Sequence, residues 1–298
     1  MTKKIQLFII CVLSVLLFFF ILDRNKTIST NSIENEQLIS EATEHNLAEH
    51  KFEVVKANDD HMADDEFIAN EEPEVEGIEV EEPINNDEDL RKPVYLTFDD
   101  GPSPATSAIL DTLQEYDAKA TFFMLEPAMR TYPDLVLRTV KDGHAVALHG
   151  VTHVTEKFYH SEQSALEEMT TAQETLENIT GIQSHLIRTP YGSIPYFTDS
   201  FRDVLAESGF KLWDWNVDSI DWILSKDEFV QNVIAQIEKV DEAGNTPIIL
   251  LHDRSETAEY LSNLLIYLLQ NNYRTEIIDE DAEPYSFNCY DRCYRYGG

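Results

Sequence analysis

The feature that most constrains the fold is a regular alternation of strand and helix patterns from residue 93 onward. Short apolar runs that can be buried on both faces are each followed by a segment with helical periodicity. Strands that alternate with helices form a parallel sheet with both faces covered, because each helix carries the chain back to start the next strand. The pattern therefore predicts an α/β fold.

The expected elements make about seven strand–helix units. We expect strands at 94–98, 118–125, 144–149, 185–188, 210–217, 247–252 and 273–278. We expect helices at 104–116, 132–142, 161–180, 197–208, 225–240 and 257–271. Gly181 is the expected stop of the helix at 161–180, and Ser225 with Glu228 forms a capping box. This number of units favours a closed or nearly closed barrel, with an open doubly wound sheet as the alternative.

The N-terminal residues predict a membrane anchor. Lys3 and Lys4 precede the apolar run Ile5–Leu22, which is just long enough to span a bilayer. The polar segment Asp23–Lys26 follows, without the small residues of a signal-peptide cleavage site. We therefore expect an uncleaved transmembrane helix rather than a removed signal. Basic residues flank the run on both sides, so they leave its orientation open.

Residues 23–92 have the composition of a disordered linker. Residues 23–90 hold 22 acidic and four basic residues without a sustained apolar period. Such a segment cannot bury enough surface to fold, and its like charges keep it extended. The whole chain has 56 acidic and 22 basic residues and a net charge of −34. That charge repels phosphate backbones, so we expect no nucleic-acid partner.

Three cysteines are too few for a disulfide framework. Cys11 lies inside the apolar run of the expected anchor, whereas Cys289 and Cys293 stand four residues apart in the C-terminal tail. The tail pair could form a small disulfide loop in an extracellular protein, or could be two unrelated thiols. The sequence leaves both interpretations open.

Ionisable residues stand at the ends of five expected strands. In a parallel barrel these ends meet at one edge, where active sites are built. The residues are Asp99, Asp100, His149, His153, Arg188, Asp218, Asp221, His252 and Asp253. Each has a structural explanation when taken alone, such as a turn or a helix cap. Their joint position at one edge predicts a functional site.

The residue types at this edge predict metal-assisted hydrolysis. Two histidines and one carboxylate, here His149, His153 and one of the adjacent aspartates, are the ligand set of a hydrolytic zinc-type site. The other aspartate could take a proton from a water molecule whose pKa the cation lowers to about 7. His252 could protonate a leaving group. Arg188 would keep the free carboxylate ionised, and an aspartate near His252 would favour its imidazolium form.

Five sequence segments carry a family resemblance. They are Thr97–Pro102, His149–His153, Arg188–Gly192, Asp218–Trp222 and Leu250–His252. On these segments, residues 93–278 closely resemble the NodB-homology polysaccharide deacetylases, carbohydrate esterase family 4. The resemblance implies a distorted (β/α) barrel that removes N-acetyl, or in some members O-acetyl, groups from a polysaccharide.

The resemblance also implies how the catalytic residues divide the work. Asp99 would be the base and His252 the acid. Arg188 would pair with Asp99, and Asp221 or Asp218 would tune the imidazole of His252.

The resemblance implies a divalent metal held by Asp100, His149 and His153. Zn²⁺ is the expected metal, and Co²⁺ is the alternative. Gly150 departs from the family pattern, which usually has Ser or Thr after the first metal histidine. We expect this glycine to loosen the metal loop without removing a ligand.

Aromatic residues near the five segments are candidates for a sugar-binding platform. We expect Tyr191, Trp222 and Leu250 to line the substrate groove. The resemblance implies that the backbone N–H of Tyr191 faces the oxyanion. Trp213 and Trp215 stand at alternate positions of an expected strand, so they would face the same side and could belong to the core.

The expected organisation resembles that of membrane-anchored peptidoglycan N-acetylglucosamine deacetylases. Residues 1–22 form a cytoplasmic tip and anchor, 23–92 a linker, 93–278 the catalytic domain and 279–298 a tail. An enzyme of this kind faces outward, acts on cell-wall polysaccharide and needs no protein partner. The alternatives are an O-acetyl esterase on another glycan and an inactive sugar-binding module. An inactive module is expected to lose its base or acid first, and this chain keeps both.

Overall fold

The computed structural model describes residues 90–297, and one parallel sheet lies at its centre. The strands are β1 (Lys92–Asp99), β2 (Thr121–Met124), β3 (Ala145–Leu148), β4 (Leu186–Ile187), β5 (Lys211–Leu212), β6 (Val217–Asp218), β7 (Ile248–His252) and β8 (Tyr273–Glu276). Their order is β5-β4-β3-β2-β1-β7-β6, and β8 pairs with the first half of β1. All of these pairs are parallel, which confirms the predicted α/β class.

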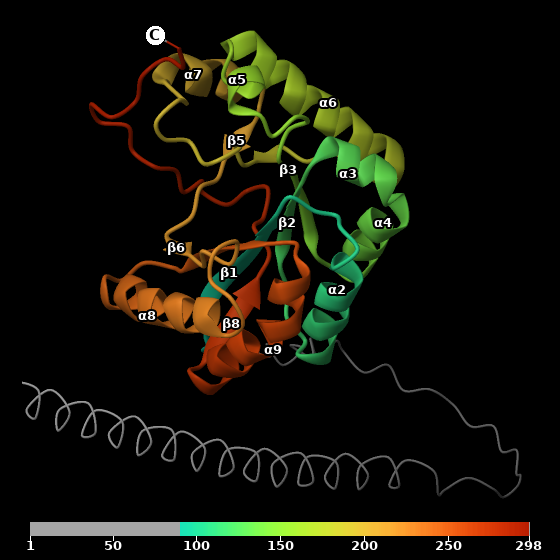
Figure 1. Cartoon of the computed structure of the whole chain (residues 1–298), viewed down its shortest axis with the longest axis vertical. Coiled ribbons are helices and arrows are strands. Elements are labelled where there is room, and N and C mark those ends of the chain that lie inside the picture. The colour runs from blue at the N-terminus through green and yellow to red at the C-terminus, as the bar shows by residue number, and fades with distance from the viewer. Residues whose placement is uncertain (1–89, 298) are drawn as a thin grey trace, which may run out of the picture. The chain divides into compact units, whose positions relative to one another are not determined.

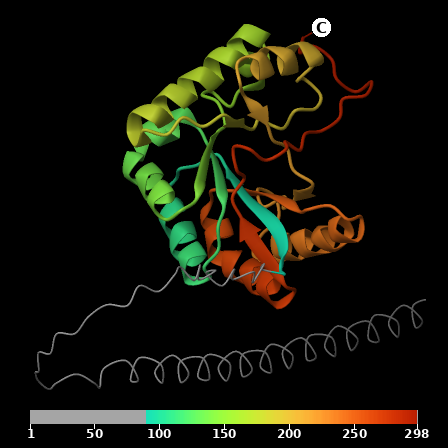
Figure 2. The ribbon, with the colours of Figure 1, turned by 180° about the vertical axis from the view of Figure 1, so that it is seen from behind.

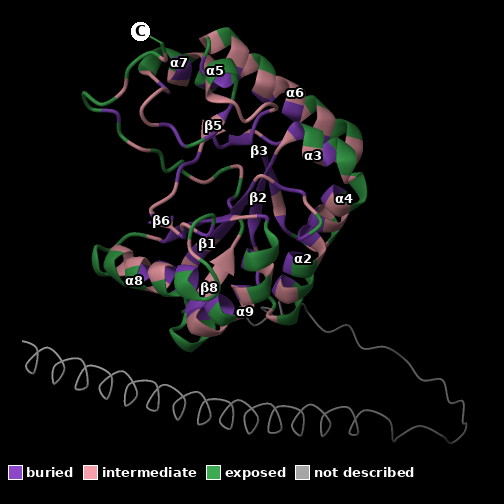
Figure 3. Cartoon of the chain, viewed as in Figure 1, coloured by how far each residue is buried: buried purple, intermediate pink, exposed green. Residues whose placement is uncertain are grey.

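Helices cover the outside of this sheet (Figures 1 and 2). They are α2 (Thr106–Glu115), α3 (Glu126–Thr131), α4 (Pro133–Lys141), α5 (Thr155–Phe158), α6 (Glu162–Thr180), α7 (Asp199–Glu207), α8 (Glu228–Glu242) and α9 (Ser255–Gln270). Neighbouring helices pack on one another, α6 on α3, α4 and α7, and α9 on α2 and α8. The buried residues follow the strands and the inward faces of these helices (Figure 3).

The sheet curls into a half-barrel whose two edge strands, β5 and β6, do not pair with each other within residues 90–297. The expectation of one strand over 210–217 is wrong, because this segment forms β5 beside β4 and then β6 beside β7. The intervening residues cross the open side of the half-barrel. Their carbonyl groups accept hydrogen bonds from Arg188 rather than from a neighbouring strand, at 3.0 Å for Trp213 and 3.1 Å for Asp214.

Local capping residues determine how well the helix ends could be predicted. The expected helix at 161–180 is confirmed as α6, which the Ser161 side chain caps and which ends at Gly181 with a φ of 74°. The expected start at Ser225 is wrong, because α8 begins at Glu228 and its N-cap residue makes no side-chain cap. Only the return bond of that capping box forms, from the Ser225 N–H to the Glu228 carboxylate at 3.3 Å. Helix α3 was not expected.

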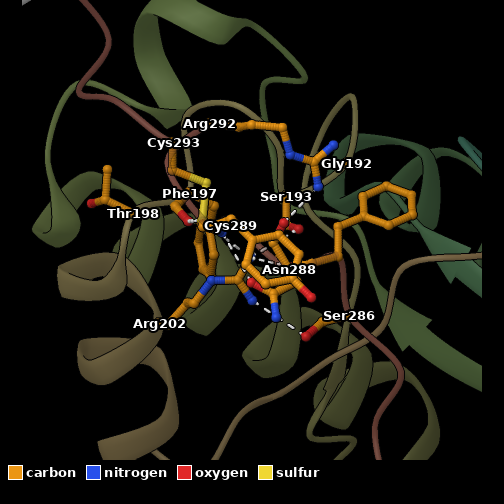
Figure 4. The surroundings of a disulfide bond; sticks show 12 residues. Gly192, Ser193, Phe197, Thr198, Arg202, Ser286, Asn288, Cys289, Arg292 and Cys293 are labelled. Carbon is orange, nitrogen blue, oxygen red and sulfur yellow. Dashed lines mark hydrogen bonds between the residues drawn. A yellow bond between two sulfur atoms is a disulfide. The ribbon is translucent and has the colours of Figure 1, made fainter.

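The C-terminal tail packs across the open side of the half-barrel (Figure 1). The Asp214 N–H donates to the Tyr285 carbonyl at 2.8 Å, and the Tyr294 N–H donates to the Pro195 carbonyl at 2.9 Å. Cys289 and Cys293 form a disulfide, so the first of the two open interpretations is the observed one. Figure 4 shows this disulfide beside the Arg202 side chain of α7.

The described part of the chain contains no helix that is long and apolar enough to cross a membrane. The predicted anchor and nearly all of the predicted linker lie outside residues 90–297.

Candidate active site

The polar strand ends meet around a cavity of about 400 Å³ at the C-terminal edge of the sheet. The predicted site residues that line it are Asp99, Asp100, His149, His153, Tyr191, Asp218, Trp222, Leu250 and His252. Arg188 and Asp221 lie buried, each bonded to one of these residues. Strand order explains the convergence: β1 pairs with β7 so that Asp99 stands level with His252.

Asp100, His149 and His153 form one compact cluster. The Asp100 Oδ1 atom lies 3.5 Å from the Nε2 atom of each histidine. Asp100 has a φ of 71° and His153 a φ of 47°, in the left-handed region that residues other than glycine seldom adopt. Such strain is concentrated at functional sites. Backbone strain therefore marks two members of the cluster, and side-chain geometry adds His149 as the third.

The chemistry of this cluster fits a divalent metal. The His149 Nδ1 atom lies 2.7 Å from the Arg188 carbonyl, so Nδ1 carries the proton and Nε2 presents its lone pair to the cluster. The Asp100 Oδ1 atom is buried without a hydrogen-bond partner among the described residues. Two metal–ligand bonds of about 2.1 Å at a tetrahedral angle separate their ligand atoms by about 3.4 Å, close to the separation found here.

Asp99 is a buried carboxylate held by a buried cation. Its Oδ1 atom accepts a hydrogen bond from Arg188 Nη1 at 2.8 Å, and its Oδ2 atom lies 3.7 Å from His149 Nε2. Arg188 is fully buried, also donates to the Thr97 hydroxyl at 2.7 Å, and lies 4.1 Å from the centre of the Phe123 ring. The guanidinium thus orients Asp99 toward the cavity with one oxygen free of the ion pair.

His252 is held by Asp221. The His252 Nδ1 atom lies 2.7 Å from Asp221 Oδ1, while Asp221 Oδ2 accepts hydrogen bonds from the His252 N–H at 2.8 Å and the Thr257 hydroxyl at 2.6 Å. Burial alone lowers the pKa of His252, but its hydrogen bond with Asp221 and the nearby negative charges outweigh burial and raise that pKa. Conversely, burial raises the pKa of Asp221, and the contacts with His252 and Thr257 bring it below its usual value.

Asp218 and Asp221 make different contacts. The sequence alone could not tell which of them contacts His252. Its carboxylate accepts the Ile220 N–H at 3.0 Å. Burial raises the pKa of the Asp218 carboxyl. Asp218 therefore lines the cavity and shapes the loop after β6, while Asp221 makes the hydrogen bond to the His252 ring.

The aromatic candidates divide between cavity and core. Tyr191 and Trp222 are 63% and 42% exposed and line the cavity. Trp213 is buried in a small core cluster, and Trp215 packs against the same cluster and also lines the cavity. Tyr191 has a φ of 64°, and its backbone N–H has no acceptor among residues 90–297. That N–H is therefore free to bind a ligand.

Asp253 is a site residue whose role the sequence did not show. Its buried carboxylate accepts hydrogen bonds from the Ser103 hydroxyl at 2.7 Å and the Thr106 hydroxyl at 2.5 Å. A Cβ atom at Gly101 would lie 2.4 Å from Asp253 Oδ2, so only glycine fits there. Asp253 thus braces the turn that follows Asp100. Its position at a strand end was the only sequence signal.

Comparison with known proteins gives one consistent family. A family model described as polysaccharide deacetylase matches residues 86–213. YheN of Bacillus subtilis, named for the same activity, is 43% identical over 65% of this chain and 69% of its own length. A peptidoglycan-N-acetylglucosamine deacetylase of Bacillus cereus is 36% identical over 74% of this chain and 81% of its own length.

A solved structure shows the same fold. The crystal structure of the polysaccharide deacetylase Bc1974 from Bacillus cereus superposes with a TM-score of 0.61 and 34% identity. The match covers 66% of this chain and 97% of that chain. Sequence and fold comparisons therefore agree on one family.

Proposed function

This chain belongs to the polysaccharide deacetylase family, carbohydrate esterase family 4, and from that premise we propose that it removes N-acetyl groups from N-acetylglucosamine units of peptidoglycan. The observation that carries the proposal is one cavity lined by the Asp99 carboxylate, the metal-type cluster and the His252 imidazole. The name of the Bacillus cereus relative supports peptidoglycan as the substrate.

The cluster of Asp100, His149 and His153 is the proposed metal site, with Zn²⁺ as the proposed ion and Co²⁺ as the alternative. A divalent metal held there supplies Lewis acidity toward the acetyl carbonyl and lowers the pKa of water. The remaining chemistry belongs to side chains and backbone groups of this chain.

Two different residues of the cavity transfer protons, one as the base and one as the acid. Asp99 accepts a proton from the attacking water, and Arg188 keeps the carboxylate oriented toward that water. The Tyr191 backbone N–H donates a hydrogen bond to the oxyanion that forms from the carbonyl oxygen. His252 donates a proton from Nε2 to the leaving nitrogen, because Asp221 already holds Nδ1. Acetate and a glucosamine amine are the products.

The exposed rings beside the cavity favour a sugar chain. Tyr191 and Trp222 present flat faces that can pack on pyranose rings, and the Trp222 ring lies 4.9 Å from the His252 ring. A sugar that stacks on Trp222 therefore places its substituents near the proposed acid. Leu250 is buried at the base of the same cavity and contributes an apolar floor.

We further propose a membrane-anchored enzyme whose catalytic domain is extracellular. The apolar run Ile5–Leu22 and the acidic segment 23–92 support this arrangement, and the tail disulfide is typical of an oxidising compartment. Protease added to intact cells should then digest the catalytic domain.

Mass spectrometry of muramidase-digested cell wall tests the function. Cells that produce the protein should contain glucosamine units lacking the acetyl group, and cells without it should not. Cells producing the Asp99→Asn variant should resemble the cells without the protein. Unchanged N-acetylation with loss of O-acetyl groups would instead identify an O-acetyl esterase, and an unchanged wall would contradict peptidoglycan as the substrate.

A further inference from the structure

The loop between β3 and α5 carries one of the proposed metal ligands in a strained backbone. Gly150 has a φ of 84° and His153 a φ of 47°. The left-handed conformation at a residue such as His153 is unfavourable and persists only where surrounding groups enforce it. Residues 150–154 belong to no helix or strand. Contacts from outside the loop must therefore hold it.

A carboxylate of α6 makes these contacts. The Glu168 Oε2 atom accepts the backbone N–H groups of Val151 and Thr152, each at 2.9 Å. The Glu168 Oε1 atom accepts the Thr152 hydroxyl at 2.7 Å. Hydrogen bonds to a charged acceptor are roughly twice as strong as neutral ones. One side chain thus fixes two consecutive peptide groups immediately before His153.

The helix that carries Glu168 is itself firmly placed. Ala165 and Met169 of α6 are fully buried in the core cluster. Glu168 therefore projects from a packed element rather than from another loop. The hydrogen bonds of Glu168 therefore fix the loop relative to the packed core.

Gly150 leaves room for the carboxylate. A Cβ atom at Gly150 would lie 3.1 Å from Glu168 Oε2 and 3.5 Å from the Phe158 ring. A larger residue would therefore crowd the oxygen that holds Val151 and Thr152. The glycine that the sequence indicated as a weakness of the loop is the residue that lets Glu168 approach.

We propose that Glu168 is a positioning residue for the metal site. Its three hydrogen bonds hold residues 151 and 152 so that the His153 Nε2 atom stays 3.5 Å from Asp100 Oδ1. The inference rests on the proposed metal site. Outer partners that orient metal ligands typically contribute about 10- to 100-fold in metal affinity.

The test measures Zn²⁺ affinity of the full-length protein in detergent by competition with a chromophoric chelator. Glu168→Ala should weaken Zn²⁺ binding by about tenfold or more. Glu168→Gln should fall between Glu168→Ala and the wild type, because its amide oxygen can accept both N–H groups but carries no charge. Glu167→Ala is the matched control and should bind as the wild type does. Glu167 is exposed, and within residues 90–297 its carboxylate bonds only to Gln163, at 2.9 Å.

A double-mutant cycle separates positioning from general destabilisation. Gly150→Ser should weaken Zn²⁺ binding in both backgrounds, because its φ of 84° strains any side chain. The loss should be smaller in the Glu168→Ala background, because the oxygen that the serine crowds is then absent. The same measurement below the melting temperature of each metal-free variant excludes unfolding as the cause. If Glu168→Ala fails to fold, the Zn²⁺ affinity of Glu168→Gln relative to the Glu167→Ala control decides in its place.

The outcomes distinguish this inference from the proposed function. A wild-type protein that binds no Zn²⁺ would contradict the metal site itself. A wild-type protein that binds Zn²⁺, together with Glu168 variants that bind it within twofold of the Glu167→Ala control, would overturn the role of Glu168 alone.

Discussion

At the scale of single residues, the site consists of buried charges that each have an opposite partner. Arg188 lies against Asp99 and His252 against Asp221, and three of these four residues are at most 3% exposed. Taking one partner away from a buried pair leaves an uncompensated charge and is strongly destabilising. The pairs therefore fix the orientation of the groups that face the cavity.

The raised pKa of His252 makes one pair testable by pH. In Asp221→Asn, burial remains but the charged hydrogen bond is lost, so the pKa of His252 should fall. The protonated acid then disappears at lower pH, and the alkaline limb of kcat/KM should shift downward. A charged hydrogen bond of about 1.5 kcal/mol corresponds to roughly one pH unit.

The control for this shift is the neighbouring aspartate. Asp218→Asn should leave the alkaline limb nearly in place, because the Asp218 carboxylate bonds to the Ile220 N–H rather than to the His252 ring. A limb that moves in Asp218→Asn and stays in Asp221→Asn would reverse the assignment.

Two substrates separate the proposed base from the proposed acid. His252→Ala should lose far more activity on an acetamide than on an aryl acetate, because an amine leaves poorly without a proton and a phenolate leaves unaided. Asp99→Asn should lose about a hundredfold on both, since both reactions need the water deprotonated. Initial rates with an N-acetyl oligosaccharide and an aryl acetate give the comparison. Equal losses of activity on both substrates in His252→Ala would instead indicate that His252 stabilises the tetrahedral intermediate.

At the scale of elements, the sequence predicted a helix or strand well where residues close in sequence determine its ends. The Ser161 cap and the Gly181 stop are local, and α6 has the predicted bounds. The segment 210–217 has alternating apolar residues that resemble one strand. Its division into β5 and β6 depends on Arg188, which takes the carbonyls of Trp213 and Asp214, and that is a tertiary contact.

The same distinction separates the predicted site residues from the missed ones. Strand topology alone brings Asp99, His149 and His252 to one edge, so their position could be predicted. Glu168 bonds to a loop distant in sequence and stands in no recognisable motif. Asp253 was expected at the site from its place at a strand end, but its bonds to Ser103 and Thr106 were not predictable. No periodicity or spacing reports such contacts, and only the folded structure reveals them.

Asp214 links two elements and supports a prediction about the tail. Its fully buried carboxylate accepts the Ser193 N–H at 3.0 Å, the Ser193 hydroxyl at 2.6 Å and the Phe287 N–H at 2.7 Å. An amide keeps only one accepting oxygen, so Asp214→Asn should leave a buried donor unsatisfied and lower the unfolding free energy by about 1–3 kcal/mol. Urea denaturation measures this loss.

The exposed Asp203 of α7 provides the matched control for the urea experiment. Asp203→Asn should leave the urea midpoint within experimental error of the wild type. An equally stable Asp214→Asn protein would show that the tail is held by other contacts, such as the Arg202 bond to the Phe287 carbonyl at 3.0 Å.

At the scale of the whole molecule, charge and chain length fit the proposed place in the cell. The linker that we propose for residues 23–92 would reach roughly 45–50 Å if it behaved as a flexible chain of about 70 residues. An anchored catalytic domain with such a linker could act on wall polymer near the membrane. The net charge of −34 opposes binding to other polyanions.

Metal removal should separate activity from folding in the full-length protein. The proposed ligands follow β1 and β3, which are joined through β2 by backbone pairing along residues that precede the ligands. The core cluster extends over strands and helices alike. Chelator should therefore abolish deacetylation while the circular dichroism spectrum persists, and added Zn²⁺ or Co²⁺ should restore the activity.

Metal binding should still raise the melting temperature, because a ligand that binds only the folded state stabilises it. Zn²⁺ at a hundred times its dissociation constant contributes about 2.7 kcal/mol, or roughly 5–11 °C for a domain of this size. The increase should grow with the logarithm of free Zn²⁺ and should be absent in His153→Ala. Full activity in the stripped protein would refute the metal site, and collapse of the spectrum on stripping would show that the ion is structural. Persistent structure without activity is the result expected of a core that folds first and then presents its ligands.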